Sequence, residues 1–247
     1  MGTTQPIRNR KELQKFSTYY QTVKPHPRNY ALIILGLNTA LRISDLLQLQ
    51  WFDVYDFYTQ RFREHLLILE QKTGKQNYIA LNKNAKNALR WYMDACFPQE
   101  SDYLFCKNTD RQHPINRSQA YRIVKEAAAQ TTNSRMVSCH SMRKTFGYHA
   151  WKQGAQPALL MGLFNHSSYD VTKRYLGIEQ DQKLSHTAQR ELHTSHSALS
   201  NIPYHSDKEY SSSPHGQLSR KNEVCKYAPA CPTTRQVPTN LSLPTVR

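Results

Sequence analysis

The regular spacing of apolar residues that predicts secondary structure ends near residue 180 of this 247-residue chain. Beyond that point lie six of the twelve prolines, the run Ser211–Pro214 and many Ser, Thr and His residues. Such a segment buries too little apolar surface to offset the entropy that ordering costs. We therefore predict one folded domain over residues 1–180 and a disordered tail over residues 193–247. Between them, residues 181–192 form either a short interaction helix or the frayed start of the tail.

The pattern within residues 1–180 predicts an α+β fold with a helical majority. Pro27 suits a helix's first turn, Ser44 is expected to cap a short helix through Leu49, and Gly154 is expected to end a helix. Apolar spacing predicts the longer helices at residues 9–23, 27–40, 83–96, 117–130, 141–153, 156–163 and 168–177. Strand-like segments predict a small three-stranded antiparallel sheet from residues 51–54, 65–70 and 77–81.

The charge of the chain indicates a polyanionic partner. The formal net charge is +15 and the isoelectric point is about 9.7. Residues 181–247 hold only eight of the 33 Lys and Arg residues, so most of the excess positive charge belongs to the predicted folded domain. Nucleic acid is the commonest partner of such a domain, although a basic protein without a polyanionic partner has the same composition.

The cysteines and the apolar runs indicate the cellular compartment of the protein. The five cysteines are an odd number without a CxxC pair, which favours reduced thiols in a cytoplasmic protein. Cys225 and Cys231 are separated by five residues without a second pair, which is poor spacing for zinc. The first sixteen residues lack the apolar core of a signal peptide, and no apolar run reaches membrane-spanning length.

Two basic segments could bind phosphate. Arg42 follows the apolar segment at 27–40 and stands at a predicted helix boundary. A guanidinium there can bind phosphate through two hydrogen bonds, although a surface cation explains the position equally well. Lys72 and Lys75 lie in the predicted turn between two strands, where a solvated hairpin tip is the simpler explanation.

Two further segments carry histidine, arginine and tyrosine. His140 and Arg143 have HxxR spacing at a predicted helix start, which places both side chains on one face beside the positive end of the helix dipole. Such a pair suits an oxyanion such as phosphate, whereas a metal at His140 lacks a second ligand one turn on. His166 precedes Tyr175 by nine residues, and a tyrosine before a leucine in a helix is usually a core residue.

The ordered set of arginine, hairpin lysine, HxxR, histidine and tyrosine resembles the tyrosine recombinases, the lambda-type integrase family. The stretch TALRISDLLQL resembles the family's first arginine box, HSMRKTFGYHAW the second, and LLMGLFNHSSYDVTKRYLGI the final box. The match spans about residues 28–178, which is the extent of a catalytic domain. Ala40 and Asn165 stand where glycine is common in the family, and neither difference removes a reacting group.

The resemblance implies a role for each residue of the set. Tyr175 would be the nucleophile that forms a 3′-phosphotyrosyl bond, and Lys72, with Lys75 as its rival, would protonate the leaving 5′-oxygen. The scissile phosphate would be bound by four side chains: Arg42, Arg143, His140 and His166. A phenol of pKa about 10 is mostly protonated at neutral pH, so the site must stabilise phenolate and phosphorane charge. The positive charge of these side chains would stabilise that negative charge without a metal or cofactor. The phosphotyrosyl bond would retain the energy of the phosphodiester, so rejoining would need no ATP.

The resemblance also implies double-stranded DNA as the partner and a homotetramer when two duplexes are joined. Family members commonly dock a C-terminal helix on the next subunit, and Leu184, Ala188 and Leu192 at 181–192 have the spacing for one apolar stripe. A separate core-binding domain is usual before the catalytic domain, but only about 27 residues precede it here. The chain is therefore either a recombinase of one catalytic domain, as in fimbrial phase-variation invertases, or a fragment.

Three other functions remain open at this point. A type IB topoisomerase uses the same chemistry without exchange between two sites. A non-catalytic DNA-binding protein could use the same fold without turnover. A metal-dependent nuclease is disfavoured because no acidic cluster lies near the basic boxes in the sequence. The sequence does not distinguish integration, excision and inversion.

Overall fold

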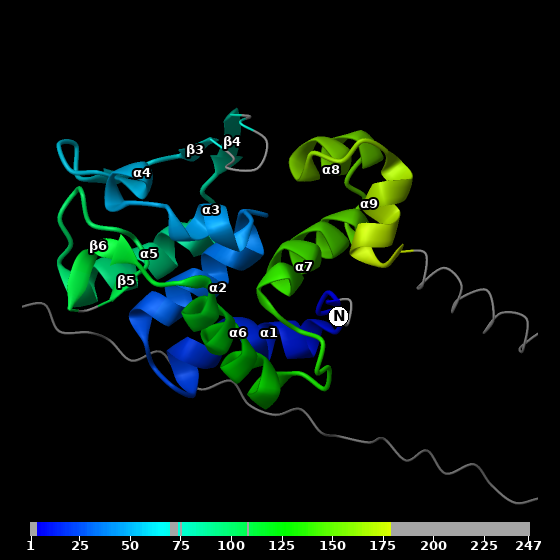
Figure 1. The fold of residues 1–247 in the computed structure, drawn as a ribbon, viewed down its shortest axis with the longest axis horizontal. Coiled ribbons are helices and arrows are strands. Elements are labelled where there is room, and N and C mark those ends of the chain that lie inside the picture. The colour runs from blue at the N-terminus through cyan, green and yellow to red at the C-terminus, as the bar shows by residue number, and fades with distance from the viewer. Residues whose placement is uncertain (1–3, 70–73, 75, 108, 179–247) are drawn as a thin grey trace, which may run out of the picture. The chain divides into compact units, whose positions relative to one another are not determined.

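The computed structural model describes residues 4–69, 74, 76–107 and 109–178, all within the first of two units, Met1–Ser200 (Figure 1). Lys72, Lys75, the 181–192 segment and the predicted tail lie outside the described residues. Within that part of the chain, no helix is long and apolar enough to cross a membrane. Its three cysteines, Cys96, Cys106 and Cys139, are free thiols, as the sequence predicts.

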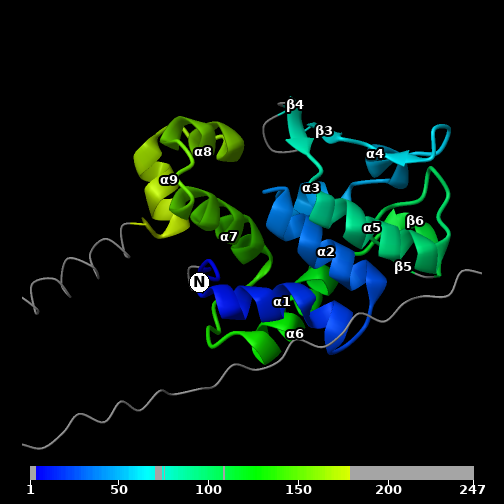
Figure 2. The same ribbon diagram turned by 180° about the vertical axis from the view of Figure 1, so that it is seen from behind.

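Helix α2 (Pro27–Asn38) is the centre of the main core. It packs against α1 (Arg10–Thr22), α5 (Lys83–Cys96) and α7 (Cys139–Lys152), as Figures 1 and 2 show from opposite sides. Helix α6 (Arg117–Thr131) packs on α1. Most of α2 is buried, because its apolar residues are nearly continuous and other helices cover several of its faces.

Asparagine side chains begin three of these helices. Asn9 accepts from the amides of the first turn of α1, Asn82 caps α5, and Asn116 forms a capping box at α6. Gly154 follows the last residue and C-cap of α7 with a φ of +88°, the left-handed conformation that glycine adopts without strain. The seven longer predicted helices are confirmed to within two residues at each end.

The predicted three-stranded sheet is wrong. The described strands form three separate antiparallel pairs: β1 (Tyr55–Asp56) with β2 (Arg61–Phe62), β3 (His65–Leu69) with β4 (Gln76–Ala80), and β5 (Cys106–Lys107) with β6 (Asp110–Pro114). Of these, the sequence predicts only the β3–β4 hairpin. In β3, Leu66 and Ile68 point into the core while alternate residues are exposed, which is the period-two pattern that identifies a half-buried strand.

Residues 51–54, predicted as the third strand, form helix α4 (Trp51–Val54). Gln50 and Asp53 make a capping box at its start. Trp51 and Val54 are both buried, and their spacing of three places them on one face of a helical turn. The β-favouring residue types suggested a strand, but burial follows the helical period.

Ser44 is not a helix cap either. Helix α3 (Ile43–Leu47) begins after Arg42, which is its N-cap, and it ends two residues earlier than predicted. Ser44 is the second helical residue, and its hydroxyl lies 3.3 Å from Oδ1 of Asp45. Arg42 has extended φ and ψ angles, so the helix starts as soon as the chain leaves that residue.

Helices α8 (Pro157–Phe164) and α9 (Tyr169–Leu176) pack together and against α7 on a small core of their own. Its buried members are Ala40, Leu160, Phe164, Leu176 and Ile178. Gly147 on α7 allows this contact, because a Cβ there would lie 2.5 Å from the Phe164 ring and 2.7 Å from Leu176. The second core is small, so the positions of α8 and α9 depend on their contacts with α7.

Candidate active site

Arg143, on the second turn of α7, joins two segments that carry predicted site residues. Its side chain is 4 % exposed, and it donates to the carbonyl oxygens of Ala40 and of Phe164, the latter at 3.2 Å. Its guanidinium carbon lies 4.8 Å from the centroid of the Phe164 ring. Ala40 precedes Arg42 by two residues and Phe164 precedes His166 by two. Arg143 therefore holds the segments of Arg42 and His166 next to one another.

Tyr175, in the last turn of α9, lies against His166 and Phe164. The ring centroids of Tyr175 and His166 are 5.0 Å apart with the planes at 72°, and those of Tyr175 and Phe164 are 5.4 Å apart. Phe164 in turn stacks on His166 at 5.5 Å. A tyrosine, a histidine and a buried arginine thus surround one phenylalanine, although they are up to 32 residues apart in the chain.

His166 is held by one hydrogen bond to a buried threonine. Its Nδ1 lies 3.0 Å from the hydroxyl oxygen of Thr172, which itself donates to the carbonyl of Ser168 at 3.3 Å. Because the hydroxyl proton of Thr172 is donated to Ser168, the hydroxyl oxygen of Thr172 accepts a hydrogen bond from Nδ1–H of His166. The Nε2 of a neutral His166 then carries a lone pair, and it becomes a donor to phosphate only when the ring is protonated.

The protonation states of the site follow from burial and from the arginines. Burial raises the pKa of the Tyr175 phenol, while the charge of Arg143, a hydrogen bond to Arg143 and the charge of Arg42 act in the opposite direction. Burial, followed by the charges of Arg143 and Arg42, lowers the pKa of His166. In the absence of DNA, the phenol is therefore protonated and the imidazole neutral at physiological pH.

His140, in the first turn of α7, is surrounded by cations. Desolvation lowers its pKa most, followed by the charges of Lys144, Arg143, Arg117 and Arg42. Its side chain nevertheless remains open to solvent. A positively charged surface of this kind favours an incoming phosphate.

Comparison with known proteins shows which family the chain belongs to. The phage integrase family profile matches residues 9–182. The chain belongs to the phage integrase family. It is a tyrosine-type site-specific recombinase, an enzyme that breaks and rejoins DNA. This assignment replaces the topoisomerase, non-catalytic and nuclease alternatives.

Several relatives are similar over most of the described domain. The chain is 39% identical over 181 residues to the probable integrase/recombinase YoeC of Bacillus subtilis, covering 73% of this chain and 93% of that protein. It is 28% identical to the type 1 fimbriae regulatory protein FimE of Escherichia coli K12, covering 60% of this chain and 73% of FimE. For tyrosine recombinase XerD of Corynebacterium glutamicum, the identity is 27%, and the match covers 62% of this chain but only 49% of XerD.

Two solved structures share the fold. The crystal structure of XerA recombinase aligns with a TM-score of 0.58 at 21% identity, covering 81% of this chain and 67% of XerA. The structure of XerH bound to its palindromic difH substrate aligns with a TM-score of 0.60 at 19% identity, covering 76% of this chain and 53% of XerH. The mostly helical α+β fold is thereby confirmed as that of a tyrosine recombinase.

The two residues of this recombinase that replace a common glycine both have left-handed backbone. Ala40 has a φ of 54° and Asn165 a φ of 53°. Asparagine tolerates this region, whereas alanine there costs about 1 kcal/mol. Each precedes a predicted site residue by one or two positions, and the carbonyl of Ala40 accepts from Arg143. The turn geometry at both positions is therefore retained without glycine.

The sequence pattern did not single out Lys144 or Arg117 of the recombinase. The Nζ atom of Lys144 lies 4.9 Å from the centroid of the Tyr175 ring. Arg117, the first residue of α6, contributes to the positive charge around His140. Lys144 follows Arg143 directly and lies one helical turn from His140, which is the only sequence feature that points to it. Nothing in the sequence connects Arg117 with the site.

Arg42 remains partly open to solvent beside a buried carboxylate. Its guanidinium lies 4.0 Å from Oδ2 of Asp45, and the exposed fractions of the two side chains are 20% and 1%. The buried carboxylate holds the guanidinium near the start of α3. Among the residues described, no group of three or more His, Cys, Asp or Glu residues could hold a metal ion.

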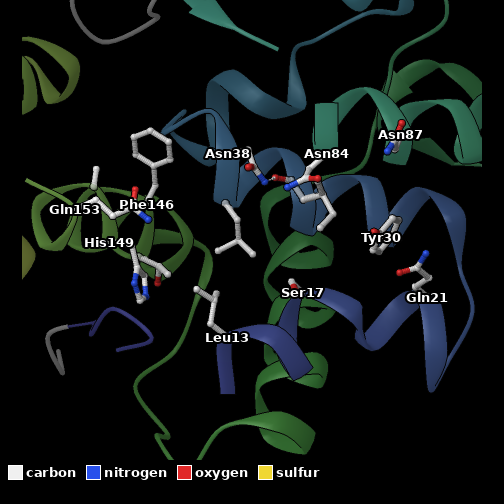
Figure 3. Close-up of a pocket in the computed structure, with 14 residues that line it drawn as sticks. Leu13, Ser17, Gln21, Tyr30, Asn38, Asn84, Asn87, Phe146, His149 and Gln153 are labelled. Carbon is white, nitrogen blue, oxygen red and sulfur yellow. Dashed lines mark hydrogen bonds between the residues drawn. The ribbon is translucent and has the colours of Figure 1, made fainter. Parts of the chain in front are cut away.

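A groove of about 630 Å³ lies elsewhere, between α1, α2, α5 and α7 (Figure 3). Phe146, His149 and Gln153 line it from α7, and Asn38 and Asn84 line it from α2 and α5. None of the candidate site residues contributes to its lining. The groove is therefore separate from the cluster of candidate site residues around Arg143.

Proposed function

We propose that the enzyme cleaves DNA by attack of the Tyr175 hydroxyl on a backbone phosphate and rejoins it by the reverse reaction. The phenolic oxygen forms a bond to phosphorus while the bond from phosphorus to the 5′-oxygen breaks, which leaves a 3′-phosphotyrosyl bond and a 5′-hydroxyl. The observation that carries this assignment is the packing of Tyr175 against His166 beside the buried Arg143. A phenolic hydroxyl, an imidazole and a cation are close together there, which supports nucleophilic attack on a phosphate.

Four side chains are proposed to bind the phosphate: Arg42, Arg143, His140 and His166. Negative charge grows on the phosphoryl oxygens and on the phenolic oxygen during attack, and preoriented cations stabilise it. Both histidines are neutral before DNA binds, since their pKa values are lowered. The phosphate favours protonation of each ring, which makes both imidazoles donors.

Covalent trapping on a randomised substrate tests the proposal for any target sequence. We expect the enzyme to form a covalent complex with members of a pool of nicked duplexes whose central segment is randomised. After attack, the short 5′-hydroxyl strand next to the nick diffuses away, so the adduct accumulates. The adduct is expected in EDTA and without nucleotide, because side chains meet the phosphate charge, and it is measured by denaturing gel electrophoresis and sequencing. A strict requirement for magnesium would contradict the proposal.

Lys72 is proposed to protonate the leaving 5′-oxygen, by its match to the family's hairpin lysine. We expect Lys72→Ala to slow cleavage on the order of 10²-fold or more, the usual contribution of a general acid. A substrate with a 5′-bridging sulfur should restore the rate, because a thiolate leaves without a proton. Lys75→Ala, three residues further along the chain, is the matched control and should change neither rate. If the substrate with the bridging sulfur restored the rate of Lys75→Ala but not that of Lys72→Ala, the general acid would be Lys75.

We propose double-stranded DNA as the substrate and a homotetramer as the recombining assembly, since exchange between two duplexes requires four cleaved strands. Solved relatives include XerH bound to a palindromic substrate and a lambda integrase dimer bound to a core site. Residues 181–192 are proposed as the contact between subunits, and the cytoplasm as the place of action. The mass of the trapped complexes measures the number of subunits in each.

A further inference from the structure

Residues 4–8, which we call the N-terminal strap, run along α7 before α1 begins. The amide of Ile7 donates to the hydroxyl oxygen of Thr145 at 2.9 Å, and the carbonyl of Ile7 lies 2.9 Å from Nε2 of His149. The amide of Gln5 donates to the carbonyl of Met136 at 3.3 Å. Ile7 itself is 2% exposed and belongs to the main core. The strap is therefore bound along two turns of the helix that carries Arg143.

Arg8 extends the strap to the end of α9. One terminal nitrogen of its guanidinium donates to the carbonyl of Gly177 at 3.4 Å, and the other donates to Gln5 at 3.2 Å. Gly177 is the C-cap of α9, with a φ of +73°, and a Cβ at this position would lie 2.6 Å from the Arg8 guanidinium. Glycine is needed there both for the backbone conformation and for the approach of Arg8.

Lys144 connects the strap to Tyr175 itself. Its ammonium donates to the carbonyl of Thr4 at 2.8 Å and lies 4.9 Å from the centroid of the Tyr175 ring. A cation at this distance over an aromatic face is attracted to the ring. The hydrogen bond to Thr4 limits where the ammonium can go, so the strap sets the position from which Lys144 contacts the tyrosine.

We propose that the N-terminal strap positions the nucleophile, with Lys144 and Arg8 as positioning residues for Tyr175. Helix α9 has eight residues, and only Thr172 and Leu176 among them are buried, so it cannot fix its own orientation. Contacts from outside the helix must do so. Arg8 of the strap supplies one at the end of the helix, and Lys144, which the strap holds through Thr4, supplies one at the ring of Tyr175. A misplacement of about 1 Å can cost roughly 10²-fold in rate. The inference rests on the proposed role of Tyr175.

Substitution of Lys144 by methionine tests the proposal, because it keeps most of the length of the side chain and removes the ammonium group with its charge. We expect Lys144→Met to slow covalent trapping at least ten-fold at saturating DNA, without a change in DNA affinity or melting temperature. Lys144→Arg should restore most of the rate. The matched control is Lys152→Met on the same helix, which should have no effect. The ammonium of Lys152 lies 4.8 Å from the ring of Trp151 and 5.8 Å from that of Tyr148, neither of which is a candidate site residue.

Two outcomes of this experiment would overturn the proposal. Trapping of Lys144→Met at the wild-type rate would show that the contact with the ring does not matter. A slow rate that saturating DNA restores would make Lys144 a DNA-binding cation and not a positioning residue.

A second measurement does not depend on cleavage. With 3-fluorotyrosine at position 175, the ¹⁹F signal of the DNA-free protein reports the environment of that ring. We expect Lys144→Met and Arg8→Ala to broaden or split the signal, and Lys152→Met to leave it unchanged. Identical spectra in all variants would overturn the strap proposal even if Tyr175 is the nucleophile. Conversely, a wild-type protein that forms its adduct through another residue would overturn the proposed role of Tyr175 while the spectra still report on the strap.

Discussion

Replacing Tyr175 by phenylalanine is expected to abolish the covalent protein–DNA complex while DNA binding is retained. The phenylalanine ring keeps the contacts with Phe164, His166 and Lys144, so the variant loses only the proposed attacking oxygen and its hydrogen bond to Arg143. Loss of a catalytic nucleophile can cost on the order of 10⁶-fold in rate, which places the variant below detection in a trapping assay. The measurement is covalent trapping on the randomised nicked pool, beside a gel-shift titration for affinity.

Tyr169→Phe is the matched control for this prediction. Tyr169 lies on the same helix, and its ring is near the ammonium of Lys173 at 5.4 Å. This variant should form the adduct at the wild-type rate. A covalent adduct retained by Tyr175→Phe would assign the nucleophile to another residue.

Replacing Arg143 by alanine is expected to remove activity and stability together. The guanidinium fills a buried position and hydrogen-bonds the carbonyls of Ala40 and Phe164, which would lose these partners. Unsatisfied buried polar groups cost about 1–3 kcal/mol each, so the free energy of unfolding should fall by roughly 3 kcal/mol. Urea unfolding measures this loss, and covalent trapping should detect no adduct because the phosphate loses a charged partner as well.

Two further variants separate the architectural role of Arg143 from its charge. Arg143→Lys keeps the charge, but its single ammonium cannot reproduce the planar fork that reaches both carbonyls. We expect an intermediate stability and a rate at least ten-fold below the wild type. Arg117→Ala removes an exposed cation near His140 and should leave the free energy of unfolding unchanged. An Arg143→Ala variant as stable as the wild type would contradict the bridging role between Ala40 and Phe164.

The helices and the β3–β4 hairpin could be predicted from the sequence because their signals are local. Apolar spacing, the Pro27 start and the Gly154 end each act within a few residues, and the structure confirms them. Residues 51–54 could not be predicted in this way. Aromatic and β-branched residues favour a strand there, but the burial of Trp51 and Val54 on one face selects a helical turn.

The candidate site could be predicted from the order and spacing of six residues, and Arg143, His166 and Tyr175 do lie together. The role of each candidate residue stays a prediction. Lys72 and Lys75 lie outside the described residues, as do the predicted helix and tail after residue 180. The contact that holds Lys144 near Tyr175 has no sequence signal. Thr4 and Lys144 are 140 residues apart, and no spacing rule connects them.

The sequence by itself determined the longer helices and the β3–β4 hairpin and indicated the candidate site residues, because periodicity, capping and residue chemistry are properties of short segments. Only the tertiary structure decided how these segments meet. The bridge from Arg143 to Ala40 and Phe164 and the path of the strap from Thr4 to Gly177 join residues distant in sequence. Such contacts depend on shape, on burial and on which carbonyl remains unpaired when the helices pack. The physical reason is that packing selects partners through space, which local patterns do not encode.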